Sequence, residues 1–218
     1  MTSTRRTRFA SLRIPALASA LALAGAAGVA TLTVPADPAA AQRSAVLSAD
    51  DYTVDTSHSS IVFRIKHAGV AYQYGRFNGV TGSFKVNPDT GHLVAASISV
   101  PSTNIDTANE QRDGHLRSGD FFDVRRHREI TFELVDGANT SSGKGSATGD
   151  LTLMGQSKEV EFDYEFTGAG DALGTAKSGF HGTFTIKRSD FGMTYGIDNG
   201  ALGDEVTLMV SIEGDKAE

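Results

Sequence analysis

The chain has 218 residues, a formal net charge of −6, and neither cysteine nor tryptophan. Without cysteine it has no disulfide bond and no thiol chemistry, so a packed core alone must hold the fold together. Its acidity disfavours nucleic acid and anionic membrane surfaces, and we therefore predict no nucleic-acid partner.

Residues 1–41 have the pattern of a secretory signal peptide. The basic stretch TRRTRFASLR precedes an Ala-rich apolar run, and Ala39 and Ala41 fit the small-residue positions of an A-x-A cleavage site. Gly25 and Gly28 interrupt the apolar run, which disfavours a stable membrane anchor.

Export is therefore expected, by the general secretory route or, given the pair Arg5–Arg6, by the twin-arginine route. The leader carries four arginines against Asp37, a net of +3, so the mature chain from Gln42 has a net charge of −9.

The composition of residues 42–51 is that of a linker, and period-two alternation follows it. In SIVFRIKH, Ile61, Phe63 and Ile65 share one face of a predicted strand, because side chains of a strand point to alternate faces. Turn signals separate such segments, at 87–91, 141–146 and 167–174. We predict eight strands, at about 52–67, 75–87, 92–101, 129–136, 146–154, 158–167, 179–188 and 204–213.

These strands predict one all-β domain over 52–214, with residues 215–218 as a tail. Eight antiparallel strands with one apolar face form either a sandwich or a barrel, and a barrel has no exposed edges. An eight-stranded barrel is packed solid or holds one small ligand. In-strand glycines favour the second arrangement, because they leave interior space: Gly75, Gly79, Gly82, Gly179 and Gly182.

One stretch, NIDTANEQRDGHLRS at 104–118, does not alternate. It predicts a short helix across one end of the barrel, with Asp106 as N-cap and Gly114 weakening the last turn. Phe121 and Phe122 follow directly, and at least one of them should point inward.

Four motifs stand out along the chain: Y-x-V-D-x-x-H-S-x-I-x-F at 52–63, N-I-D-T at 104–107, R-D-G-H-L-R-S-G-D-F-F-D at 112–123 and R-S-D-F-G-M at 188–193. They give the chain a resemblance to the YceI-like polyisoprenoid-binding family. It implies a lipocalin-like eight-stranded antiparallel barrel in the periplasm, with a long-chain isoprenoid or similar lipid inside. It also makes a homodimer plausible. No cofactor beyond the bound lipid is expected.

The predicted ligand-binding residues form an apolar wall and a polar collar. The wall comprises Phe63, Ile65, Phe84, Phe121, Phe122, Phe132, Phe162, Phe184, Ile186 and Leu208. In the collar, Arg112, His115 and Arg117 could hydrogen-bond a phosphate or quinone oxygen. His67 shares a face with Phe63 and Ile65, and Arg76 has the parity of Val80 and Phe84, so both are predicted to point inward.

Each assignment has a structural alternative. The apolar wall also fits an ordinary packed core. Asp113 and Arg117 have the i, i+4 spacing of a helix-surface ion pair, His67 fits a core histidine, and Arg188 fits a partner of Asp190.

No enzyme signature is present in the sequence. A G-x-S-x-G elbow is missing, and the six histidines lack H-E-x-x-H spacing, so we predict neither catalysis nor a metal site. The expected function is the transport, storage or protection of an isoprenoid such as a polyprenyl phosphate or a prenylated quinone. The alternatives are a carrier of fatty acids or fatty amides, and a structural or stress-response module without a ligand.

Overall fold

The computed structural model describes residues 38–137 and 143–218. The predicted signal peptide lies outside these ranges except for its last four residues, which begin helix α1 (Pro38–Leu47). Residues 42–47 of the predicted linker are therefore helical. Over the described ranges, no helix has both the length and the apolar composition needed to cross a membrane.

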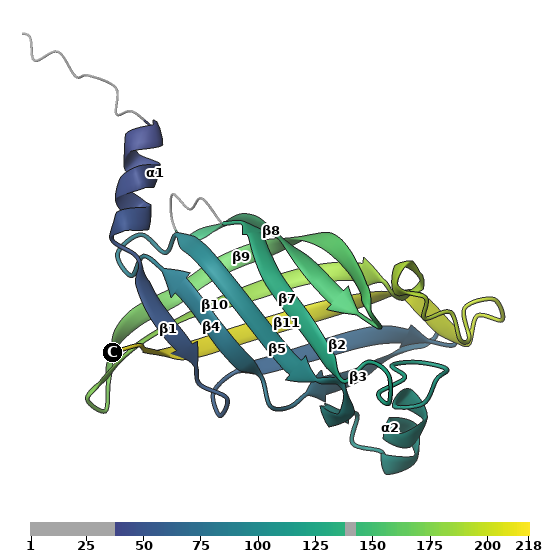
Figure 1. Ribbon diagram of the computed structural model, residues 1–218. Helices are drawn as coiled ribbons and strands as arrows, with labels where there is room; N and C mark the ends of the chain where they lie inside the picture. Colours follow the sequence, from purple (N-terminus) through teal and green to yellow (C-terminus); the bar gives the residue numbers. More distant parts are fainter. Residues whose placement is uncertain (1–37, 138–142) are drawn as a thin grey trace, which may run out of the picture. The chain divides into compact units, whose positions relative to one another are not determined.

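The remainder is almost entirely β-structure (Figure 1). The strands are β1 (Asp50–Val54), β2 (Ser60–His67), β3 (Ala71–Phe77), β4 (Thr81–Val86), β5 (Leu93–Pro101), β6 (Ile105–Asp106), β7 (Glu129–Asp136), β8 (Lys144–Leu153), β9 (Gln156–Ala172), β10 (Thr175–Lys187) and β11 (Leu202–Lys216). Helix α2 (Glu110–Leu116) and the 3-10 turns η1 (Ser102–Asn104) and η2 (Arg188–Phe191) complete the fold.

All pairings are antiparallel and the sheet closes on itself. The order runs β1-β4-β5-β7-β8-β9-β10-β11, and β1 also pairs with β11 through Val54 and Gly214. The short strands β1 and β2 lie end to end along the same flank of β11, and β4 and β3 pair with them in turn. The predicted eight-stranded antiparallel barrel with a short helix at one end is confirmed.

Two of the predicted strands are each broken once. The segment 52–67 is interrupted at 55–59, and the segment 75–87 at 78–80, where Gly79 has φ +79°. The second break shifts the side-chain alternation by one residue: Phe77 points inward before it and Phe84 after it. The alternation of inward and outward side chains on one side of this break therefore does not predict the direction of side chains on the other side.

Strands β9 and β10 are longer than predicted. The Gly-rich segment 167–174 is strand up to Ala172, and the hairpin loop consists of Leu173 and Gly174, both with positive φ. Such a two-residue left-handed loop matches the twist of the flanking strands. The predicted turn at 87–91 does separate β4 from β5, with Asn87 Oδ1 accepting from the backbone of Asp89 and Thr90.

One end of the barrel is closed by stacked aromatic rings. Tyr52 stacks on Phe84 at 5.2 Å between centroids, and Phe84 meets Phe180 edge-on at 5.3 Å. Tyr164 packs on Phe180, and its buried hydroxyl donates to the carbonyl of Gly91 at 2.9 Å. Each of these rings is buried, so this end is a solid core.

Several glycines make room for rings rather than for empty space. A Cβ on Gly75 would lie 2.4 Å from the ring of Phe63, and one on Gly149 would lie 2.2 Å from the ring of Phe132. At Gly82 (φ +138°) a Cβ would meet the carbonyl oxygen of Ser97. The prediction that Gly75 and Gly82 leave free interior space is therefore wrong, whereas Gly182 does border the barrel interior.

The closed end should dominate stability. We expect Phe84→Ala to lower the free energy of unfolding by about 3–5 kcal/mol, because it removes a ring packed between two others. Urea unfolding followed by circular dichroism measures this. Leu173→Ala, at an exposed loop tip, is the control and should change the value by less than about 0.5 kcal/mol. Equal effects of the two substitutions would contradict the packing described here.

Candidate functional site

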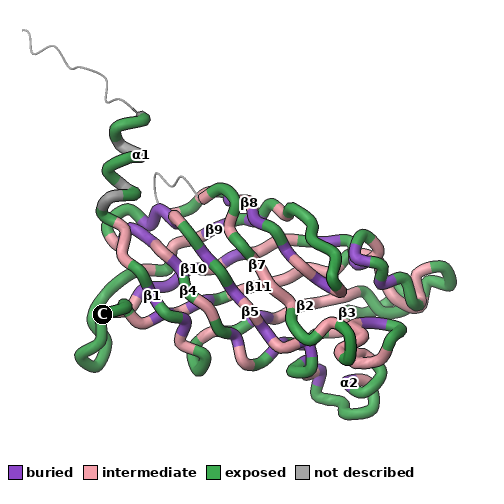
Figure 2. The backbone as a smooth tube through the Cα atoms, in the orientation of Figure 1, coloured by how far each residue is buried: buried purple, intermediate pink, exposed green. Residues whose placement is uncertain are grey.

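The half of the barrel beyond the aromatic core encloses a cavity of about 480 Å³. Its wall is overwhelmingly apolar and is built from residues of all the strands except β1, β4 and β6, together with α2 and the loops at the mouth. Some of the lining residues are buried, but others are only half-buried although they face the interior, whereas the inward rings at the closed end are all buried (Figure 2). Examples of the half-buried set are Phe63, Ile65, Phe132, Phe184, Leu208 and Val210.

The cavity opens at the end where α2 lies. His67 at the end of β2, His115 on α2 and Tyr195 in the loop after η2 border this mouth, and all three are exposed. The Tyr195 ring lies 5.1 Å from that of His115 and 5.2 Å from that of Phe121. Phe121 and Phe122 both line the cavity, as the first apolar surface inside the mouth.

Twelve of the fifteen predicted ligand-binding residues line this cavity. They are Phe63, Ile65, His67, Arg112, His115, Phe121, Phe122, Phe132, Phe162, Phe184, Ile186 and Leu208. Their placement makes contact with a ligand sterically possible, and their role as ligand contacts stays a prediction.

The other three lie elsewhere, for identifiable reasons. Phe84 is part of the aromatic core at the closed end. Arg76 was placed inward by parity with Phe84, but the break at 78–80 reverses that parity, and Arg76 is exposed and paired with Asp106 at 3.1 Å. Arg117 donates to the carbonyl oxygens of Thr103 and Ile105 and so anchors α2 to the preceding segment.

Helix α2 is held in place by polar contacts with the turn before it. Its N-cap is Asn109, whose side chain accepts from the backbone of Arg112, not Asp106 as predicted. The Arg112 guanidinium donates to the hydroxyl and the carbonyl oxygen of Thr107 at 2.7 and 2.6 Å. The buried carboxylate of Asp113 accepts from the same threonine. Arg112 therefore borders the cavity, and its Nε and Nη2 already donate to Thr107.

Arg188 is the most deeply buried charged residue of the described chain, at 2% exposure. It is not paired with Asp190. Its guanidinium donates to the carbonyl oxygens of Met193, Tyr195 and Gly203 at 2.8–3.0 Å, which fixes the loop beside the mouth. Burial lowers the pKa of this guanidinium. Because an arginine remains charged at such a site, Arg188 places a positive charge next to the cavity wall.

Sequence reasoning missed part of the wall. Met193, Tyr195, Leu151 and Leu153 line the cavity although none was selected. Leu151 and Leu153 alternate within the predicted strand 146–154, so the same parity rule would have found them. Met193 and Tyr195 lie in an irregular loop, where no periodicity indicates direction.

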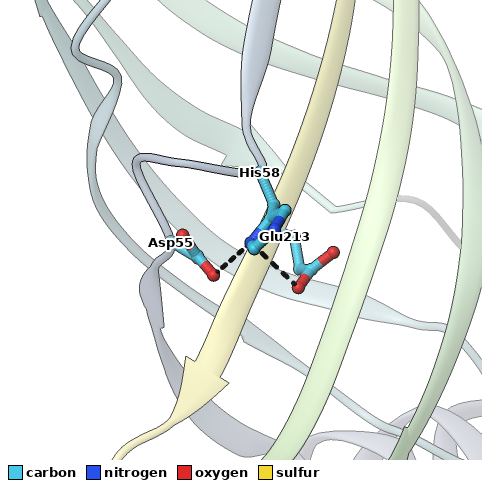
Figure 3. A group of neighbouring side chains, drawn as sticks. All are labelled: Asp55, His58 and Glu213. Atoms are coloured by element: carbon cyan, nitrogen blue, oxygen red, sulfur yellow. Dashed lines mark hydrogen bonds and ion pairs between the residues drawn. The ribbon is translucent and has the colours of Figure 1, made fainter. Parts of the chain in front are cut away.

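A second polar cluster lies where β1 gives way to β2, beside β11 (Figure 3). His58 Nδ1 is 2.7 Å from Asp55 Oδ2 and 3.8 Å from Glu213 Oε1. The Lys177 ammonium lies 3.1 Å from the same Asp55 oxygen, 3.0 Å from the same Glu213 oxygen and 2.6 Å from Asp215. We refer to these five residues as the Asp55 cluster.

The cluster shifts the protonation of its members. Hydrogen bonds from His58, Ser57 and Lys177 hold the pKa of Asp55 well below its usual range. The hydrogen bond to Asp55, with the charges of Asp55 and Glu213, raises the pKa of His58. Hydrogen bonds to Asp215, Glu213 and Asp55 raise the pKa of Lys177.

Asp55, His58 and Glu213 have ligand atoms close enough to hold a metal ion. However, Lys177 already presents a cation to the two carboxylate oxygens that would coordinate it. The arrangement is explained as an ion-pair network that ties the turn between β1 and β2 to β10 and β11. Sequence reasoning did not find it, because Glu213 is 155 residues from His58.

Comparisons with known proteins identify the family. The model of the YceI-like domain matches residues 52–214. The chain belongs to the YceI-like family. A UPF0312 protein of Pseudomonas aeruginosa is 37% identical over 169 residues, which cover 76% of this chain and 87% of that protein. A UPF0312 protein of Vibrio cholerae is 37% identical over 149 residues, covering 67% and 79%.

Two solved structures share the fold. The YCEI protein of Campylobacter jejuni has a TM-score of 0.64 at 28% identity, covering 70% of this chain and 90% of that one. A polyisoprenoid-binding domain from Saccharophagus degradans has a TM-score of 0.59 at 13% identity, covering 76% and 98%. At that identity the second likeness concerns the fold alone.

The Asp55 cluster should make stability depend on pH through His58. A raised folded-state pKa means that the contribution of His58 is fully present below its unfolded pKa of about 6.5 and is lost as pH rises through the folded value. We therefore expect the melting temperature of the wild type to exceed that of His58→Gln at pH 6, and the difference to shrink by pH 9.

Differential scanning fluorimetry at these pH values measures the difference. His67→Gln serves as the control, because His67 is an exposed histidine at the mouth, outside the Asp55 cluster. A difference between wild type and His58→Gln that grows with pH would refute the assigned ion pair.

Proposed function

We propose that this protein holds a long-chain isoprenoid, such as a polyprenyl phosphate or a prenylated quinone, in its barrel. It does so in the periplasm, as a non-catalytic protein for transport, storage or protection of the lipid. The observation that carries the proposal is the apolar cavity, which is open at one end and closed by aromatic rings at the other. Family membership and the polyisoprenoid-binding domain that shares the fold support it.

The cavity shape orients the ligand. Because the closed end is packed, a chain can enter only through the described mouth, tail first, with its polar end left at the rim. There it meets Arg112 and His115. His115 Nε2 already contacts Asp120 Oδ2 at 2.9 Å and Arg112 donates to Thr107, so His115 Nδ1 and the remaining Arg112 nitrogen are the groups that can donate to a phosphate or carbonyl oxygen. Arg188 adds a positive charge on the same wall and so favours an anionic or strongly polar end group.

Selectivity cannot come from hydrophobicity alone. Each buried methylene contributes about 0.8 kcal/mol relative to water, but the lipid normally resides in a membrane that is equally apolar. Transfer from the bilayer to the barrel therefore gains little from the hydrophobic effect. The discriminating factors are the length and width of the cavity and the polar contacts at the mouth.

A carrier of fatty acids or fatty amides is the second candidate. Its support is the cavity volume of about 480 Å³, which lies in the range of small-molecule pockets of about 300–1,000 Å³. A single acyl chain suits such a volume. The third candidate, an interaction module with a filled core, is disfavoured by the same cavity.

Mass spectrometry of organic extracts from gently purified protein tests the proposal. We expect one lipid per chain in the wild type. The double substitution Val206→Phe with Val210→Phe places two rings on the cavity face of β11 and should lower the lipid content severalfold or select shorter chains. Glu205→Phe with Ser211→Phe, on exposed positions of the same strand, is the matched control. Lipid-free wild type, or equal lipid content in both double variants, would contradict the proposal.

The polar contacts can be tested separately. We expect His115→Ala to weaken retention of the extracted lipid by about tenfold, the effect of one lost hydrogen bond to a charged group. Arg76→Ala removes a positive charge outside the cavity and should leave retention unchanged. Competition with a fluorescent lipid measures both, and a larger effect of Arg76→Ala would exclude the assigned mouth.

A further inference from the structure

We propose that the mouth of the barrel docks on a lipid bilayer through a rim of exposed apolar and aromatic side chains. The rim consists of Val70, Tyr72, Tyr74 and Tyr195. This inference rests on the proposed function, since it assigns the surface through which the lipid enters. The rim is distinct from the cavity, however, and separate variants test the two.

Exposed large apolar side chains are concentrated at this end of the barrel. Among the described residues, seven such side chains are exposed, and four of them form the rim. The other three, Val46, Val135 and Leu173, lie on separate elements and are isolated, as single surface apolar residues commonly are. The clustering of the rim therefore calls for an explanation that the others do not need.

The rim is carried by the β2–β3 hairpin, where Tyr72 and Tyr74 lie opposite Lys66 and Arg64, and by the segment after η2. Val70 lies in the three-residue loop between β2 and β3, where Ala68 and Gly69 both have positive φ, and its side chain is 85% exposed. The backbone N–H of Ala68 donates to the carbonyl of Ala201 at 2.9 Å, which holds this loop against the segment after η2. That segment also carries Tyr195.

The side chains of the rim are of the kind that membrane interfaces favour. Tyrosine is enriched where hydrocarbon meets water, because its ring is apolar and its hydroxyl remains hydrated. The Arg64 guanidinium lies 4.8 Å from the centre of the Tyr72 ring and adds a cation at the same level. Tyr74 and Tyr195 also border the cavity, so the rim passes directly into the lipid-accepting surface.

The negative charge of the chain is not concentrated at the mouth, so an anionic bilayer does not strongly repel this end of the protein. The segments around the mouth, 64–74, 110–128 and 187–205, contain nine Lys or Arg and eight Asp or Glu residues, a net charge of +1. The mature chain carries −9, so its excess negative charge lies elsewhere. With its mouth towards a bilayer, the protein presents its least acidic end.

The absence of tryptophan allows a direct test. Single substitutions Val70→Trp and Tyr195→Trp place a reporter on the rim, and Leu173→Trp places one on the loop between β9 and β10 at the opposite end. Each variant is mixed with vesicles of phosphatidylethanolamine and phosphatidylglycerol, with and without brominated acyl chains. We expect a blue shift and bromine quenching for the rim reporters and neither change for Leu173→Trp.

Two further measurements decide the assignment. Adding Val70→Asp to the Tyr195→Trp variant should raise the vesicle concentration at half-binding about tenfold, the effect of losing one buried valine. Adding Val206→Phe and Val210→Phe should leave vesicle binding unchanged, because these residues block the cavity and not the rim. Rim reporters that do not respond, or a Leu173→Trp reporter that responds equally, would overturn the docking surface whatever the lipid extracts contain.

Discussion

Closure of the barrel depends on strand β11. It is long enough to pair with β10 along one edge and with both β1 and β2, end to end, along the other. The chain between β1 and β2 must therefore leave the sheet and return to it at the same edge. The Asp55 cluster stabilises this detour: Asp55 and His58 belong to the turn, Glu213 and Asp215 to β11, and Lys177 to β10. Ser59 adds a reciprocal pair of hydrogen bonds with the backbone of Glu213.

The motifs that carry the family resemblance lie at such anchoring points. Asp55 and His58 hold the break between β1 and β2. Thr107, with Arg112 and Asp113, fixes the start of α2 against the end of β6. Arg188 binds the loop carbonyls beside the mouth, and the hydroxyl of its neighbour Ser189 donates to Asp204. These polar residues position the wall, whereas the wall itself is apolar and is formed by residues outside the motifs as well.

The two ends of the barrel interior differ: one is packed with aromatic rings and the other encloses the cavity. At one end Tyr52, Phe84, Tyr164 and Phe180 fill the barrel and bury their rings, which supplies the packing that a disulfide-free domain requires. At the other end the inward side chains surround the cavity and do not fill it. A second, smaller buried cluster around Phe121, Phe191 and Met193 lies beside the mouth, so the domain packs apolar side chains on both sides of the cavity.

The sequence alone determined most of the strands and most of the cavity wall, because inward and outward side chains alternate with a period of two. Phe63, Phe132, Phe184 and Leu208 were found by this rule. The alternation left a sandwich and a barrel open, and the family resemblance supplied the barrel. Only the tertiary structure determined the positions of the residues to which this alternation does not apply. The break at Gly79 reversed the direction of Arg76, and the packing of four rings removed Phe84 from the cavity. The Asp55 cluster joined residues more than 150 positions apart, a proximity that only the closed sheet creates, because strand pairing and not chain distance sets which side chains meet.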